Sequence, residues 1–280
     1  MDRTAFVLGG GGPLGAYEVG MLQALIERGI VADLVVGTSI GAINGAGIAA
    51  DPTLEGVSKL RSVWLSLDEQ EMFGGGLFAT ALNAFRSRTH LYSIEPLRAM
   101  LSQWLPERFE DLAIDFQCVA ASIERSAEQW FSSGALVEAI LASSSVPGLF
   151  PPVEIDGEHY IDGGIVNSIP VRRAVELGAT TVYVLQVGRV ERKLSAPRRP
   201  WEVALVALEV ARRHRFFGEM ASLPAGVAAH VLPTGASDPP GQRIRQVDPN
   251  LAERRFQQAY QASGAYLDRE LDDMRDSVAT

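Results

Sequence analysis

Short apolar runs and segments with the spacing of a helix alternate along the first part of the chain. Residues 5–8 are all apolar and predict a buried strand. Apolar residues then recur at the spacing of one helix face, at Leu14, Tyr17, Met21 and Leu25. A second strand is predicted at 33–36, and a segment rich in small and apolar residues follows it. This strand–helix–strand–helix order predicts a mainly parallel sheet with helices on both faces, whose functional groups gather at the carboxyl ends of the strands.

The middle of the chain continues with both kinds of pattern. Residues 51–105 predict helices, except for a loop or a flap over a pocket at 73–78, which is rich in Gly and Phe. Further strands are predicted at 116–122, 153–155 and 181–187. Asp156 and Gly157 are typical of a hairpin turn. These segments add strands and helices to the same α/β arrangement.

The most specific motif lies where the second strand meets its helix. Gly37, Ser39 and Gly41 form a G-x-S-x-G sequence after an apolar, β-branched run. That order is typical of a nucleophile elbow, a sharp strand-to-helix turn that exposes the serine Oγ. Side chains at the flanking glycines would collide with the neighbouring strand and helix. Ser39 is therefore the candidate nucleophile.

Two other segments carry groups that an acyl hydrolase needs. Gly10, Gly11 and Gly12 precede a predicted helix and would present backbone N–H groups to a developing oxyanion, together with the N–H of Ile40. Asp162 follows a short strand and precedes a glycine turn. From that position its carboxylate would reach Ser39 as a base.

Together these motifs resemble the patatin-like phospholipase family. The matching segments are, in the family's order, 10–15, 37–41 and 162–164, with further similarity at 91–97, 142–152 and 167–171. The motif glycines are Gly15, Gly37, Gly41, Gly163 and Gly164. The resemblance covers about residues 4–187, and no clear linker follows. The chain is therefore predicted to be a single domain, 1–280, in which 188–280 adds C-terminal helices and a further strand.

The resemblance implies a three-layer α/β/α sandwich and a Ser–Asp dyad that cleaves lipid acyl esters without a catalytic histidine. Ser39 would attack the carbonyl carbon, and Asp162 would take the serine proton and later activate water. A carboxylate with a free pKa of about 3.9 is a weak base. The dyad therefore needs a close hydrogen bond and a water-poor pocket. Leu14 departs from the family, which often has Arg or Lys at this position.

Composition and charge exclude several other classes of protein. A net charge of −9 over 280 residues argues against a general nucleic-acid binder. The single cysteine, Cys118, excludes an internal disulfide, and no cluster has metal-ligand spacing, so neither a metal nor a cofactor is predicted. The apolar run 5–8 is too short for a secretory signal, and polar residues and glycines interrupt 30–50. A cytoplasmic chain without a membrane span is expected.

Three alternatives remain open. Residues 10–15 also fit the G-x-G-x-x-G fingerprint of dinucleotide-binding proteins, although no acid ends the second strand. A Ser–Asp–His triad would use His214 or His230 as the base. The third alternative is a silent lipid-binding protein that kept the pocket and lost turnover, which Leu14 leaves open.

A basic segment, 189–217, bears on possible partners other than the lipid or acyl-ester substrate. Eight Arg or Lys stand against three Glu between residues 189 and 215. An apolar helix candidate, 201–208, lies inside this segment. The pattern fits either a core-packed helix whose arginines reach water or a face that docks peripherally on an anionic membrane. The sequence does not predict the oligomeric state.

Overall fold

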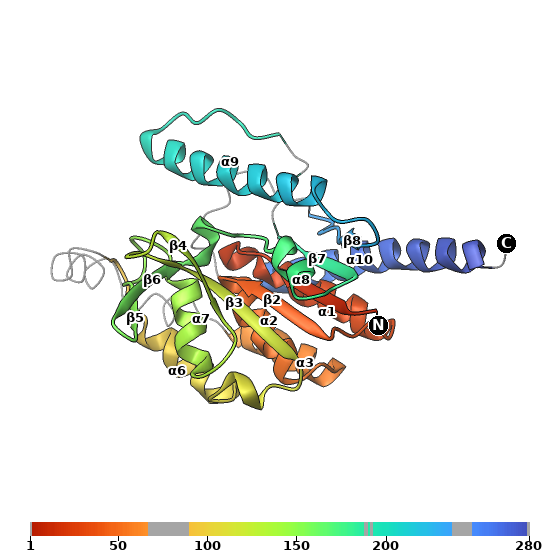
Figure 1. Cartoon of the computed structure of the whole chain (residues 1–280), viewed down its shortest axis with the longest axis horizontal. Coiled ribbons are helices and arrows are strands. Elements are labelled where there is room, and N and C mark those ends of the chain that lie inside the picture. The colour runs from red at the N-terminus through yellow and green to blue at the C-terminus, as the bar shows by residue number, and fades with distance from the viewer. Residues whose placement is uncertain (1, 67–89, 188–189, 191–192, 237–247, 279–280) are drawn as a thin grey trace.

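Eight strands of the described chain form one central sheet (Figure 1). The computed structural model describes residues 2–66, 90–187, 190, 193–236 and 248–278. In sheet order, the strands are β5 (Val153–Ile155), β6 (Glu158–Asp162), β3 (Asp115–Ser122), β2 (Leu34–Thr38), β1 (Thr4–Leu8), β7 (Thr181–Leu185) and β8 (Ala228–Val231). The remaining strand, β4 (Ala127–Phe131), pairs with β3 beside this path.

The five strands from β3 to β8 run parallel, whereas β4, β5 and β6 are antiparallel to their neighbours. The carboxyl ends of β1 and β2 therefore lie at one edge, where Leu8 pairs with Gly37. β6 arrives from the opposite direction and pairs Asp162 with Ala120 of β3. This reversal brings the end of β6 toward the edge where β2 ends.

Strand β1 is apolar at every position from 5 to 8 because both of its faces are covered. Phe6 and Leu8 pack in the larger apolar cluster, while Ala5 and Val7 pack in a second cluster across the sheet. Successive strand residues point to opposite faces. A strand that is covered on both sides therefore reads as a continuous apolar run.

Helices cover both faces of the sheet, which confirms the predicted three-layer α/β/α sandwich. The larger cluster draws on α1 (Ala16–Glu27), α2 (Ile40–Ala50), α3 (Leu54–Ser66), α6 (Glu95–Trp104), α7 (Leu136–Ser144) and α10 (Pro249–Val278). The second cluster draws on α8 (Val171–Glu176) and α9 (Pro200–Ala221). Three short 3-10 helices are η1 (Gly12–Gly15), η2 (Phe109–Asp111) and η3 (Gly163–Ile165).

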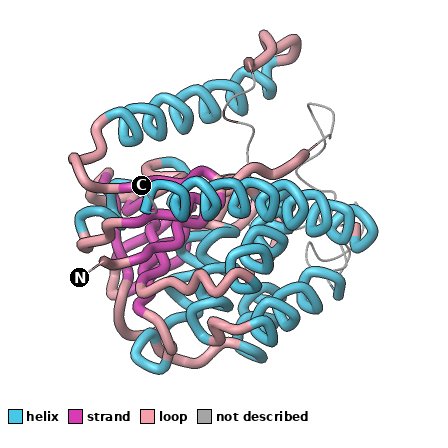
Figure 2. Tube along the Cα trace, turned by 90° about the vertical axis from the view of Figure 1, so that its right-hand side faces the viewer, coloured by secondary structure: helices cyan, strands magenta, loops and turns pink. Residues whose placement is uncertain are grey.

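The long helix α10, which leads to the C mark in Figure 2, packs closely along α1. A Cβ on Gly20 of α1 would collide with the carbonyl oxygen of Phe256 in α10, so only glycine permits this approach. Phe256 and Leu267 are buried in the larger cluster. The segment after residue 187 thus contributes helices and a strand to the apolar clusters that cover the sheet.

The strand predictions were right for most segments and incomplete for one. The hairpin signal at Asp156 and Gly157 is confirmed, because both have positive φ, 52° and 82°, in the turn between β5 and β6. β4 was not predicted, because its five residues are partly exposed and carry no apolar run. The loop or flap predicted at 73–78 lies outside the described residues.

Candidate active site

Ser39 occupies a strained turn between β2 and α2. Its backbone has φ 56° and ψ −124°, which is unusual for a residue with a side chain. A Cβ on Gly37 would collide with the carbonyl oxygen of Gly41, and one on Gly41 with that of Leu8. The two glycines therefore let strand, turn and helix pack tightly, as a nucleophile elbow requires.

The Ser39 hydroxyl donates a hydrogen bond to the carboxylate of Asp162. Ser39 Oγ and Asp162 Oδ2 are 2.5 Å apart. The other carboxylate oxygen, Oδ1, accepts the backbone N–H of Gly164 at 2.7 Å. A Cβ on Gly163 would collide with the carbonyl oxygen of Val119, so glycine is needed at this turn. The turn after β6 thus fixes the carboxylate in a position to accept the serine proton.

Burial changes the acid–base properties of this pair. Ser39 and Asp162 are each 7% exposed. Desolvation raises the pKa of Asp162 to about 6, and the hydrogen bonds from Ser39 and Gly164 hold it from rising further. A carboxylate with this pKa is a stronger base than a free aspartate, and it is still mostly ionised at neutral pH.

The backbone of Ser39 is held from the other side by α7. Its N–H donates to Ser143 Oγ at 2.9 Å. The carbonyl oxygen of Ser145, just after this helix, accepts the N–H of Asp162 at 2.9 Å. Residues 143–145 therefore tie the two members of the pair to a single helix end. The bond between Ser39 and Ser143 spans 104 positions, so nothing local in the sequence predicts it.

One of the oxyanion donors predicted in the glycine loop after β1 is already occupied by another hydrogen bond. The N–H of Gly10 donates to the carbonyl oxygen of Ser168 at 2.9 Å, so it is not free for an oxyanion. The N–H groups of Gly11, Gly12 and Ile40 have no hydrogen-bond acceptor in the described part of the chain. Gly12 has φ 56°, a conformation that glycine adopts readily. Three of the four expected donors thus remain available.

A cation does reach this loop, from a different helix. Arg255 of α10 is almost fully buried, and its guanidinium donates to the carbonyl oxygen of Pro13 at 3.0 Å. The guanidinium also lies over the ring of Tyr17. Leu14 itself packs against the larger apolar cluster. The positive charge that Leu14 does not supply is therefore present beside the loop, although the sequence could not reveal this.

A buried polar network links the far end of the glycine loop to α2. Asn44 Nδ2 donates to the carbonyl oxygen of Gly15 at 3.0 Å and to Glu18 Oε2 at 2.7 Å. Asn44 Oδ1 accepts the indole N–H of Trp64 at 3.0 Å. Desolvation raises the pKa of Glu18 well above its usual range. The sequence contains a sign of this buried network. Glu18 stands four residues after Leu14, so a charged residue falls on the predicted apolar face of the helix.

The histidines lie away from the Ser39–Asp162 pair. His230 stacks on Tyr183 and hydrogen-bonds to the Tyr266 hydroxyl, and His214 is exposed on α9. Ser39 and Asp162 bond to no histidine in the described part of the chain. Within those residues, no group of three or more His, Cys, Asp or Glu side chains is placed to hold a metal ion.

Two curated proteins are similar to this chain in sequence. Lysophospholipase NTE1 of Candida glabrata is 31% identical over 198 residues, which cover 68% of this chain and 11% of that protein. Patatin-like phospholipase domain-containing protein 7 of Rattus norvegicus is 34% identical over 190 residues, covering 67% and 14%. This chain thus spans only 11% to 14% of the length of these curated relatives.

Among solved structures, VipD from Legionella pneumophila has a TM-score of 0.48 at 17% identity, covering 96% of this chain and 67% of that one. A family model described as patatin-like phospholipase matches residues 6–175. This match contains the glycine loop, the elbow and the aspartate turn, which the structure brings together at one edge of the sheet. The chain therefore belongs to the patatin-like phospholipase family.

Proposed function

We propose that the chain is a serine acyl hydrolase that cleaves acyl esters of lipids through Ser39 and Asp162. The observation that carries this proposal is the 2.5 Å hydrogen bond from a strained elbow serine to a buried carboxylate. Family membership supports hydrolysis of an ester bond, and the relatives named lysophospholipases support a lysophospholipid as the substrate.

The reaction begins when Ser39 Oγ attacks the carbonyl carbon and its proton passes to Asp162. The tetrahedral intermediate collapses as the ester C–O bond breaks and the proton moves to the leaving oxygen. Water then attacks the acyl-serine, Asp162 accepts a water proton, and the proton returns to Ser39 Oγ as the fatty acid leaves. A single carboxylate therefore serves as base and acid in each half of the reaction.

The N–H groups of Gly11, Gly12 and Ile40 are proposed to stabilise the oxyanion. Gly12 begins η1 and Ile40 begins α2, and helix N-termini leave N–H groups unpaired. Each donor aimed at the oxyanion lowers the barrier by roughly 3–4 kcal/mol at most. Arg255 holds the carbonyl oxygen of Pro13 and adds positive charge beside the loop.

The pH dependence of ester hydrolysis tests this function. Because only the ionised carboxylate can accept the proton of Ser39, kcat/KM should rise about tenfold per pH unit below pH 6 and level off above it. The folded pKa exceeds the unfolded value of about 3.9, so ionisation of Asp162 lowers stability as pH rises from about 4 to 6. The rate should therefore increase over the pH range in which the fold becomes slightly less stable.

The measurement uses a p-nitrophenyl ester and a lysophospholipid as parallel substrates, with the melting temperature recorded at each pH. Failure of the purified, folded chain to hydrolyse either ester would contradict the function. A rate that does not vary between pH 5 and pH 8 would contradict the role of Asp162.

We further propose that α9 contacts the lipid surface through apolar side chains. Val203, Val210 and Phe217 are 53%, 52% and 50% exposed, and their spacing of seven residues places them on one side of the helix. α9 lies at the periphery of the molecule, at the top of Figure 1 and of Figure 2.

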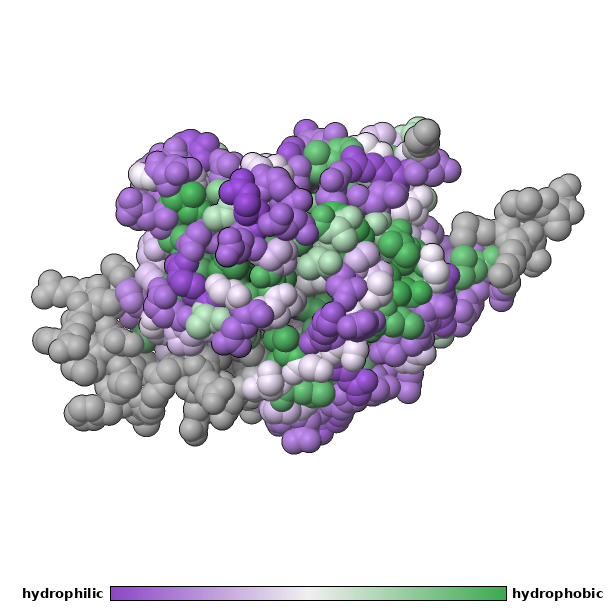
Figure 3. Space-filling model, turned by 90° about the horizontal axis from the view of Figure 1, so that it is seen from below, coloured by the Kyte–Doolittle hydropathy of each residue, from purple (hydrophilic) through white to green (hydrophobic). Residues whose placement is uncertain are grey.

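Figure 3 shows the molecule from below, on the side away from α9. On that face the apolar areas are separated by polar ones. No described helix is long and apolar enough to cross a bilayer.

In this proposal the arginines of the basic segment 189–217 contribute less to lipid contact than the apolar side chains of α9 do. Arg212 and Arg213 are mostly buried and both pair with Glu209, while Arg215 pairs with Glu128 and Glu219. Arg189 and Arg192 lie outside the described residues. Paired arginines attract anionic lipid weakly, so apolar contact is the stronger contribution expected of α9.

Vesicle co-sedimentation tests the contact. The double variant Val210→Asp/Phe217→Asp should reduce the bound fraction at least tenfold, because two exposed apolar side chains lose their favourable transfer into lipid. Val31→Asp is the matched control, since Val31 is 47% exposed and lies outside α9. Equal binding by the double variant and the wild type would refute contact through α9.

A further inference from the structure

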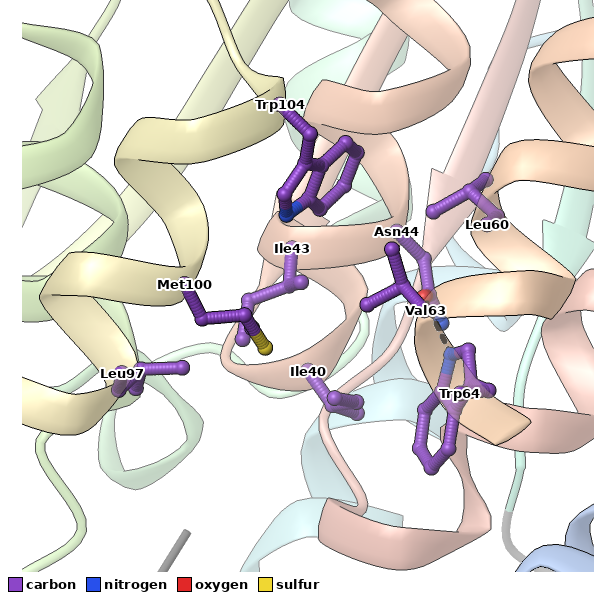
Figure 4. A pocket seen from close by; sticks show the side chains of 9 residues that line it. All are labelled: Ile40, Ile43, Asn44, Leu60, Val63, Trp64, Leu97, Met100 and Trp104. Atoms are coloured by element: carbon purple, nitrogen blue, oxygen red, sulfur yellow. Dashed lines mark hydrogen bonds between the residues drawn. The ribbon is translucent and has the colours of Figure 1, made fainter. Parts of the chain in front are cut away.

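A small apolar pocket lies beside the nucleophile, between α2, α3 and α6 (Figure 4). It has a volume of about 40 Å³, and eight of its nine lining residues are apolar. Figure 4 shows side chains from the three helices directed toward one common space. Six of the lining side chains carry no nitrogen or oxygen, so most of the lining favours an apolar ligand. The indole N–H of Trp104 is the exception, because it is buried without a hydrogen-bond partner among the described residues.

The pocket begins one residue away from Ser39. Ile40 follows the nucleophile, belongs to the proposed oxyanion donors through its N–H, and lines the pocket with its side chain. Ile40, Val63 and Met100 are partly exposed, whereas Ile43 and Leu60 are buried. The pocket therefore has an accessible rim on the side of the elbow residue and a closed apolar floor.

The side-chain amide of Asn44, which also lines the pocket, does not call for a polar ligand. Asn44 is fully buried, and its amide group is already occupied by Gly15, Glu18 and Trp64. This network also holds α2 and α3 together at the floor. A Cβ on Gly47, one turn further along α2, would approach the side chains of Leu60 and Trp104 too closely. The floor is therefore tightly packed, and the length of the pocket is fixed.

We propose that this pocket binds the first carbons of the substrate's acyl chain, an inference that rests on the proposed acyl hydrolase function. A site needs about 10–15 Å³ for each water-sized atom, so 40 Å³ accommodates about three methylene groups. Each buried methylene contributes roughly a fourfold gain in binding. Acyl-chain carbons beyond these three lie past the rim of the pocket and add little to the binding free energy.

The test is the chain-length profile of p-nitrophenyl esters from acetate to octanoate. For the wild type, kcat/KM should rise roughly fourfold with each carbon from acetate to pentanoate and then level off. Val63→Phe fills the pocket and should flatten this rise, so that kcat/KM no longer increases from acetate to pentanoate. Met100→Ala enlarges the pocket and should extend the rise by two or three carbons. Both positions are partly exposed, so both variants should fold.

Leu101→Ala is the matched control. Leu101 neighbours Met100 on α6 and is fully buried, but it does not line the pocket. Its replacement should lower the melting temperature without changing the chain-length profile. A wild-type profile in both Val63→Phe and Met100→Ala, or in the one that folds, would overturn the proposal. Failure of the wild type to hydrolyse even the acetate ester would instead refute the acyl hydrolase function, so the two failures are distinguishable.

Discussion

Replacing Ser39 by Ala is expected to lower ester hydrolysis by at least about 10⁴-fold, because the variant lacks the hydroxyl proposed to form the acyl-enzyme. The chain should remain folded. Alanine meets the same backbone strain at φ 56° as serine does, and the N–H of residue 39 keeps its bond to Ser143 Oγ. The rate is measured with a p-nitrophenyl ester and a lysophospholipid, and folding with the thermal melt.

Ser144→Ala is the matched control for this variant. Ser144 is a buried serine of α7, and its Oγ has no hydrogen-bond partner among the described residues. Its loss should leave the rate within a few-fold of wild type. Substantial turnover by a well-folded Ser39→Ala variant would mean that another residue is the nucleophile.

Asp162→Asn should reduce the rate by roughly 10²–10⁴-fold, the usual contribution of a positioned base. The amide has almost the volume of the carboxylate, and its oxygen can still accept the N–H of Gly164. It cannot accept the serine proton as a base. Because the variant removes a desolvated charge, its melting temperature at pH 7 should equal or exceed that of wild type.

The histidine alternative is tested alongside this variant. His214→Ala and His230→Ala should retain the rate within several-fold and keep the rise across pH 6, since neither side chain bonds to Ser39 or Asp162. A histidine variant that stays folded and loses as much activity as Asp162→Asn would replace the dyad with a triad.

The parts of the site that local sequence encodes could be predicted. The elbow around Ser39 follows from two glycines at fixed offsets and an apolar strand before them, all within seven residues. The three-layer fold followed from the order of strands and helices. Ser39 and Asp162 are 123 positions apart, and their pairing was predicted from the position of Asp162 after a short strand together with the family resemblance.

Contacts between distant segments could not be predicted. Arg255 lies 242 positions after the loop carbonyl that it binds, and nothing in its own sequence surroundings indicates that partner. The N–H of Gly10 was assigned to the oxyanion because the sequence does not reveal its bond to Ser168. β4 is defined by its pairing with β3 rather than by its own composition.

The number of Arg and Lys in 189–217 does not by itself predict a basic surface. An excess of Arg and Lys predicts a basic surface only if the side chains are free. Arg212 and Arg213 follow Glu209 by three and four positions, the spacing at which opposite charges pair on a helix. The sequence alone therefore favours pairing of these two arginines with Glu209.

Fluorophosphonate labelling, followed by mass spectrometry of the intact chain and its peptides, tests whether Ser39 is a nucleophile activated by Asp162. We expect one adduct per chain, on the peptide that contains Ser39. The labelling rate should be about tenfold lower at pH 5 than at pH 7 and should fall sharply in Asp162→Asn. An adduct on another residue, or a folded chain that hydrolyses esters but does not react at Ser39, would contradict the claim.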